Sequence, residues 1–148
     1  MGTGLADARS LAAGINQLVL WLRRHTTPEF SSSTITALDR LRLEGPLRVS
    51  ELAAREAISQ PGSTLLVNRL ADAGYAERVP DPTDGRASLV RITSTGEAVL
   101  RRREDQRAEA LRERMEFLSE TDRALITAAL PAIERLVATD KDLGRKNR

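Results

Sequence analysis

Residues Ser59–Thr93 read SQPGSTLLVNRLADAGYAERVPDPTDGRASLVRIT, and this stretch decides the fold. Its first half has the apolar spacing of an amphipathic helix. Ser59 is a favourable N-cap, and Pro61 is tolerated in a first helical turn because its missing N–H would be unbonded there. We expect this helix to end near Ala73, where Gly74 supplies the stop.

The second half of the same stretch changes to the period of β-strands. Tyr75–Val79 and Ser88–Thr93 are strand-like, and the second segment is rich in β-branched residues. The loop between them contains two prolines and Asp84-Gly85, which favour a tight turn. An antiparallel hairpin is therefore predicted.

Three helices are expected before this stretch. The first covers residues 8–25, and the second is capped within Ser31–Ser33 and stops at residues 44–46. The third is the short segment SELAAREA, residues 50–57, with Ser50 as its N-cap. The chain then turns sharply into the helix described above.

Two helices are expected after the hairpin. The letters STGE fit a capping box with Ser94 as the cap and Glu97 reaching back, and the helix runs to about Leu118. A second cap at Ser119 opens a last helix, which contains Pro131 and should be kinked there.

The centre of this order is a helix-turn-helix followed by a β-hairpin, which is a winged helix. The predicted fold class is mainly α, with a two-stranded hairpin as the wing. A helix of about 15 residues with a polar face near its N-terminus fits the major groove of DNA. That face comprises Ser59, Gln60, Gly62, Ser63, Thr64, Asn68 and Arg69. For Arg69, an ion pair with Asp72 is an equal alternative.

The stretch Ser59–Thr93, preceded by VSELAAREA at Val49–Ala57, resembles the MarR family of bacterial transcriptional regulators. The specific part is the D-P-x-D-x-R wing joined to L-V-x-I-T. The resemblance implies a single-domain, homodimeric DNA-binding regulator, most typically a repressor relieved by a small ligand. Its winged-helix region would cover about residues 31–94, and dimerisation helices about residues 5–27 and 95–140. Two recognition helices would then enter successive major grooves of a near-palindromic double-stranded DNA operator.

The resemblance also implies roles for individual residues. Asp84 and Arg86 match the wing, in which the aspartate braces the arginine and the arginine tip enters the minor groove. We therefore expect Asp84 to accept a hydrogen bond from the Arg86 guanidinium. Family members commonly carry Arg where this chain has Leu65, so one phosphate or base contact is missing. The residues on the family's recognition-helix pattern are Ser59, Gln60, Pro61, Thr64, Val67 and Arg69.

Dimer contacts and an effector pocket follow from the same resemblance. Many relatives bind small aromatic or anionic effectors between the dimerisation helices and the winged domain. Trp21, His25 and Arg42 are the candidates to line such a pocket, although a lone Trp and a lone His usually serve packing. The expected dimer-interface residues are Leu11, Ile15, Leu125, Leu130, Ile133, Leu136 and Val137.

The composition argues against several other classes of protein. The 148-residue chain has one His and no Cys, which leaves few nucleophile–base pairs and no thiolate metal site. No Gly-rich phosphate loop or metal-ligand spacing is present. No apolar run approaches the roughly 20 residues of a membrane span. We therefore expect a cytoplasmic protein that is not an enzyme and has no cofactor, no metal and no membrane partner.

The charge distribution leaves one alternative open. Residues 48–95 contain six basic and six acidic residues, so bulk charge does not mark a DNA-binding face. This balance and Leu65 are compatible with a winged-helix dimer that acts as a protein-interaction module. Salt-sensitive affinity for duplex DNA distinguishes the two functions.

Overall fold

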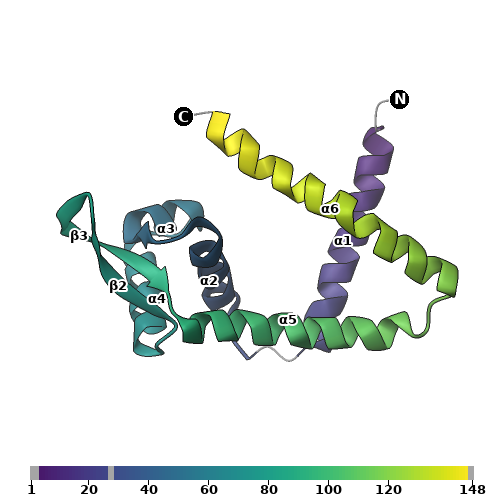
Figure 1. Cartoon of the computed structure of the whole chain (residues 1–148), viewed down its shortest axis with the longest axis horizontal. Helices are drawn as coiled ribbons and strands as arrows, with labels where there is room; N and C mark the ends of the chain where they lie inside the picture. Colours follow the sequence, from purple (N-terminus) through teal and green to yellow (C-terminus); the bar gives the residue numbers. More distant parts are fainter. Residues whose placement is uncertain (1–3, 27–28, 147–148) are drawn as a thin grey trace. The chain divides into compact units, whose positions relative to one another are not determined.

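The computed structural model describes residues 4–26 and 29–146, with side chains described for residues 4–26 and 29–138. Within these residues the elements follow the order α1, α2, β1, α3, α4, β2, β3, α5, α6 (Figure 1). The chain divides into two compact units, Met1–Ala108 and Glu109–Arg148. The first unit contains the winged helix, and the second contains the end of α5 and all of α6.

The core of the first unit lies between three helices and a small sheet. The helices are α2 (Ser32–Glu44), α3 (Val49–Arg55) and α4 (Gln60–Asp72). Apolar residues at helical spacing supply their buried faces, and each buried leucine contributes roughly 1.5–3 kcal/mol. This packing holds α4 in place. The largest fully buried side chains are Leu38, Leu41, Leu52, Leu70, Leu100, Val67, Val90 and Ser63.

The predicted hairpin is present, with longer strands and an earlier turn than expected. Its strands are β2 (Ala76–Asp81) and β3 (Asp84–Ile92). The turn lies at Pro82-Thr83, because Asp81 pairs with Asp84 across the hairpin end. Proline is favoured at the first central position of such a turn. The prediction of a turn at Asp84-Gly85 is therefore wrong, and Gly85 lies within β3 without a positive φ.

A third strand, β1 (Leu47–Arg48), extends the hairpin into a sheet of order β1-β3-β2. It pairs antiparallel with β3, with Leu47 opposite Val90. Both of those side chains are buried in the core. The expected two-stranded wing is thus a three-stranded sheet. The sequence did not predict β1, because a two-residue strand is too short to show a periodic pattern. Burial of the Leu47 side chain in the core places β1 beside β3.

Three of the predicted helix caps are confirmed. In each of them a serine hydroxyl oxygen accepts a backbone N–H from three residues further along the chain. The pairs are Ser31 with Thr34, Ser59 with Gly62, and Ser119 with Asp122, at 3.2, 3.2 and 3.1 Å.

Two of the predicted caps are wrong by one or two residues. α3 already begins at Val49, and the Glu51 carboxylate accepts the backbone N–H of Arg48 at 2.8 Å, so Ser50 is not the cap. At the start of α5 (Ser94–Met115), the Thr93 hydroxyl accepts the N–H of Gly96 at 3.2 Å. Thr93, the residue between β3 and α5, therefore caps α5 in place of Ser94.

The remaining helices are α1 (Leu5–His25) in the first unit and α6 (Glu120–Lys146) in the second. α5 ends three residues before the predicted Leu118, and Pro131 lies inside α6 as expected. Within the part of the chain that the structure describes, none of the helices has the length and apolarity that crossing a membrane requires.

Candidate nucleic-acid interface

Helix α4 has one face in the core and another in solvent. Its N-terminus is capped by Ser59, which accepts the N–H groups of Gly62 and Ser63, and the helix dipole gives that end a partial positive charge. A phosphate oxygen can be bound at such a helix start. The side chains exposed at the cap and along the helix are those of Ser59, Gln60, Pro61, Thr64, Leu65, Asn68 and Arg69.

Two residues predicted to bind DNA lie on the core face instead. Ser63 and Val67 have no exposed surface. They are four residues apart and share the face that carries Leu66 and Leu70. The Ser63 hydroxyl donates to the carbonyl oxygen of Val49 at 3.1 Å and so joins α4 to α3. For these two side chains the predicted DNA contact is wrong.

Hydrogen bonds within the protein change what the exposed polar residues offer to a ligand. The Thr64 hydroxyl donates to the carbonyl oxygen of Gln60 at 3.1 Å, so its proton is already bonded within the helix. The Asn68 side-chain oxygen accepts from Arg78 of β2 at 3.1 Å, which links α4 to the wing. The sequence reasoning missed Arg78, because nothing local shows that it reaches α4.

The guanidinium of Arg69 is available to bind a ligand. In the described part of the chain it forms no ion pair with Asp72, so the alternative of an intrahelical pair is not observed. Arg69 and Asp72 are both exposed. The guanidinium is therefore positioned to contact a phosphate or a base edge.

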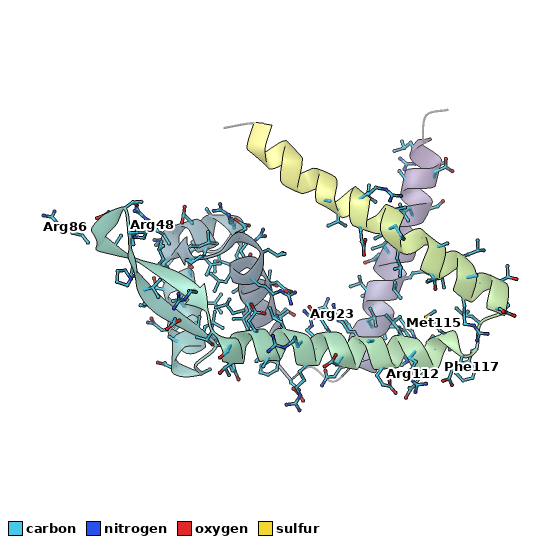
Figure 2. The ribbon with its side chains drawn as sticks, in the orientation of Figure 1. Arg23, Arg48, Arg86, Arg112, Met115 and Phe117 are labelled. Carbon is cyan, nitrogen blue, oxygen red and sulfur yellow. The ribbon has the colours of Figure 1, made fainter. Side chains whose placement is uncertain are left out.

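The wing presents Arg86 at its end. Its side chain projects away from the hairpin (Figure 2), and within the described residues no carboxylate pairs with it. Asp84 does not hold the guanidinium as predicted. Its Oδ1 accepts the backbone N–H of Arg86 at 3.1 Å, and its Oδ2 lies 3.7 Å from a guanidinium nitrogen of Arg48. Asp84 therefore orders the backbone under Arg86 and leaves the Arg86 side chain extended.

A buried carboxylate anchors the hairpin end. Asp81 accepts the Thr83 N–H at 2.8 Å and the Thr83 hydroxyl at 2.7 Å. It also accepts two hydrogen bonds from Arg48, at 2.6 and 2.9 Å. The Thr83 donors, followed by Arg48, lower the pKa of Asp81 to about 2. No local sequence pattern shows the contact between Asp81 and Arg48, because the two residues are 33 positions apart.

A second site lies between the end of α1, the start of α2 and the middle of α5. It is a cavity of about 250 Å³ within the first unit. Three arginines line it, Arg23, Arg103 and Arg107, with Phe30 and Ile35 as apolar walls. Glu29 also lines the cavity, and its carboxylate pairs with Arg102 at 2.7 Å.

The electrostatics of this cavity favour an anion. The Nε of Arg107 is buried without a hydrogen-bond partner among the described residues. Burial, then the charges of Arg107 and Arg23, lower the pKa of Arg103, and the charge of Asp39 only partly opposes them. Arginine does not deprotonate in proteins. Like charges are thus held together, and a bound anion would relieve their repulsion.

The structure does not bring the three predicted effector residues into this cavity. The Trp21 and His25 rings stack on each other with centroids 4.4 Å apart, and His25 Nδ1 lies 2.8 Å from the Trp21 carbonyl oxygen. Arg42 bonds Asp39 and Glu104, both at 2.8 Å, and the Glu104 bond raises the pKa of Arg42. No side chain of these three is among the residues that line the cavity.

The residues predicted for the dimer interface are exposed in the isolated chain. Leu11 and Ile15 of α1 have exposed fractions of 53% and 49%. On α6, five apolar residues between Leu125 and Val137 are between 49% and 64% exposed. Each helix thus carries an apolar stripe that has no partner among the described residues of its own unit.

Comparison with known proteins gives the family. Residues 30–87 match the model of the MarR family. The chain is 32% identical over 136 residues to the uncharacterized HTH-type transcriptional regulator Mb0904 of Mycobacterium bovis, covering 89% of this chain and 95% of that protein. It is 23% identical over 130 residues to the regulator YfiV of Bacillus subtilis, covering 88% of this chain and 79% of YfiV.

Solved structures share the fold. The transcriptional regulator Tm0710 of Thermotoga maritima has a TM-score of 0.75 and 24% identity, with 94% of this chain and 99% of that chain covered. PcaV of Streptomyces coelicolor, solved with its natural ligand, has a TM-score of 0.53 and 25% identity, with 91% and 97% covered.

The winged-helix fold of this chain agrees with these solved structures. The matching proteins are regulators and not enzymes. The chain belongs to the MarR family of DNA-binding transcriptional regulators.

Proposed function

We propose that this protein is a homodimeric cytoplasmic repressor that releases its operator when a small aromatic anion binds the arginine cavity. The observation that carries the proposal is the buried, unpartnered Nε of Arg107 beside two further arginines. A buried donor without a partner is costly, and a carboxylate offers the acceptor that it lacks. PcaV, solved with its natural ligand, is a relative in fold.

The cavity also favours a particular kind of anion. Its volume of about 250 Å³ lies just below the roughly 300–1,000 Å³ of pockets for drug-sized ligands, so it suits one ring. Phe30 and Ile35 supply apolar contacts for that ring. The arginines supply planar donors that match a carboxylate. An aryl carboxylate therefore fits better than a sugar or an amine.

Release of DNA has a physical route through α5. Arg103, Gln106 and Arg107 lie on this helix, whose second turn packs Val99 and Leu100 into the winged-helix core. Across the cavity, Arg23 belongs to α1 and Ile35 to α2. An anion that binds these arginines would draw them together and thereby shift α5 relative to α2. The bound form would then hold the recognition helices at a spacing that differs from the operator half-sites.

The experiment measures the affinity for an operator that the purified protein selects from random duplex DNA. Two-fold symmetry predicts half-sites about 10 base pairs apart, centre to centre. Benzoate should raise the melting temperature of the protein and weaken operator binding, whereas neutral benzyl alcohol should do neither. Arg107→Gln should abolish both responses. Arg112→Gln, on the exposed part of α5 in the second unit, is the matched control and should retain them.

Two results would contradict this proposal. Benzoate that binds with unchanged operator affinity would remove the regulatory role of the cavity. Binding to DNA phosphates releases counterions and therefore depends on salt. An affinity for duplex DNA that is independent of salt would favour the alternative function, a winged-helix dimer that acts as a protein-interaction module. The relatives are regulators by name, which supports DNA as the partner.

A further inference from the structure

The exposed face of α4 contains an apolar residue at its centre. Leu65 is 60% exposed, whereas the adjacent Leu66 is 4% exposed and fills the core. Helical geometry places Pro61, Asn68 and Arg69 around Leu65, at four residues before it and three and four residues after it. All three of these neighbours are exposed. Leu65 is therefore not part of the buried core and stands in the middle of the exposed face of α4.

Its neighbours extend this apolar character. Pro61 has no N–H and lies one helical turn before Leu65, so the two form a short apolar strip. The Thr64 hydroxyl proton is bonded to the carbonyl oxygen of Gln60. A base or phosphate acceptor would have to displace that bond to be recognised by Thr64. The Thr64 methyl group remains free for an apolar contact, and the hydroxyl oxygen can still accept a hydrogen bond.

The DNA major groove offers one apolar group in unmodified DNA, the C5-methyl of thymine. The other edges there are nitrogen and oxygen donors and acceptors, and an aliphatic side chain against them would leave them unsatisfied. Building on the DNA binding of the family, we propose that Leu65, with Pro61 and Thr64, reads a thymine methyl in each operator half-site. Leu65 is thereby a specificity-determining residue and not a lost contact.

The surroundings of Leu65 favour DNA as the occupant over a protein partner. Arg69 lies one turn further along α4 without an ion pair among the described residues. Gln60 at the helix start has the amide that pairs with an adenine edge. These polar groups flank the apolar strip, so they are placed to hydrogen-bond to the edges of the neighbouring bases. A protein partner that covered the strip would remove water from these polar groups without supplying matching hydrogen bonds.

The test replaces thymine by deoxyuridine, which removes only the methyl group. Each thymine of the selected operator is replaced in turn, and dissociation constants are measured by fluorescence anisotropy at constant salt. One position per half-site should lose roughly fourfold in affinity, and both positions together roughly fifteenfold, from the cost of one buried methyl each. Leu65→Ala should bind the unmodified operator more weakly and be insensitive to deoxyuridine at those positions.

The matched control is Leu43→Ala on α2, since Leu43 has nearly the same exposed fraction, 59%. It should keep the full response to deoxyuridine. Leu65→Arg should lose the methyl response and bind with a steeper salt dependence, by about one counterion per site. Thermal melts confirm that each variant folds.

Operator binding that is indifferent to deoxyuridine at every thymine would overturn the inference. So would an equal loss in wild type and Leu65→Ala. Either result leaves the repressor proposal intact, because that proposal depends on benzoate and Arg107. Loss of the benzoate response with a retained methyl response would overturn the repressor proposal alone.

Discussion

Asp81 shows how one residue sets the geometry of the wing. Its side chain is 4% exposed, and a buried carboxylate is tolerated only when it is paired and hydrogen-bonded. Arg48 and Thr83 meet that requirement from two sides. Without these donors the turn at the wing end would have no anchor to the sheet edge at β1.

Asp81→Asn should lower stability in a pH-dependent manner. The pKa of Asp81 is lowered in the folded state, from 3.8 to about 2. Its contribution to the free energy of unfolding is therefore full above about pH 4 and is lost as the pH falls towards 2. Urea unfolding at several pH values should show the largest deficit for the variant near neutrality and the smallest at the lowest pH, as the pH falls through the folded-state pKa of about 2. Asp72→Asn, exposed at the end of α4, is the control and should change little at any pH.

Gly96→Ala should destabilise the fold by roughly 1–3 kcal/mol through overpacking. An added Cβ would collide with the carbonyl oxygen of Tyr75 and lie 2.8 Å from Cγ1 of Ile92. Gly14→Ala is the control, because a Cβ there meets nothing within 4 Å and Ala favours a helix interior by roughly 0.8–1.0 kcal/mol. Urea midpoints at pH 7 measure both effects, and equal stability of the two variants would refute the close approach at Gly96.

At the scale of elements, side-chain contacts join the wing and α4 into one structural unit. Arg78 of β2 bonds Asn68 of α4, and the Arg48–Asp81 pair joins β1 to the end of β2. These contacts fix the distance between the recognition helix and Arg86. The wing arginine can then reach a minor groove while α4 lies in the adjacent major groove.

Asp84→Ala should weaken DNA binding, although it removes a negative charge. Its carboxylate orders the backbone of Arg86, so its loss should cost roughly 0.5–1.5 kcal/mol, the worth of a hydrogen bond. Arg86→Ala should cost roughly 1–3 kcal/mol and reduce the salt dependence of binding by about one counterion. Anisotropy titrations over a range of salt concentrations measure both. Tighter binding by Asp84→Ala would show that bulk charge outweighs order at the wing.

At the scale of the whole molecule, α1 and α6 carry most of the exposed large apolar side chains among the described residues. Leucine, isoleucine and valine side chains of this density rarely stay in water on a monomer. The proposed dimer covers these stripes and relates its two winged helices by a two-fold axis. A palindromic operator is the matching DNA symmetry.

Ile133→Asp on α6 should dissociate the proposed dimer. Burying an unpaired carboxylate in an apolar seam costs at least roughly 2 kcal/mol, or about thirtyfold in the dimer dissociation constant. Sedimentation equilibrium measures that constant. Leu43→Asp on α2, at a position with an exposed leucine outside both stripes, should leave it unchanged. A monomeric wild type at micromolar concentration would contradict the dimer.

The sequence by itself determined the order of the helices and of the two hairpin strands, the positions of most helix starts and stops, and the family. These features depend on interactions within a few residues, such as Ser59 with Gly62, or on apolar spacing along one segment. The winged-helix fold and the recognition helix were predictable for that reason. The predicted caps at Ser50 and Ser94 were wrong because α3 begins directly after β1, with Arg48 at its N-cap position, and because Thr93, the residue after β3, caps α5.

Only the tertiary structure decided which side chains of α4 are buried and which distant residues meet. Ser63 is polar, yet a carbonyl group of α3 accepts its hydroxyl proton and allows it into the core. Arg48 meets Asp81, and Arg23 meets the α5 arginines, across long separations in the chain. Such pairings depend on how the buried faces of all the elements fit together, and the free energy of that packing is not encoded in any local segment.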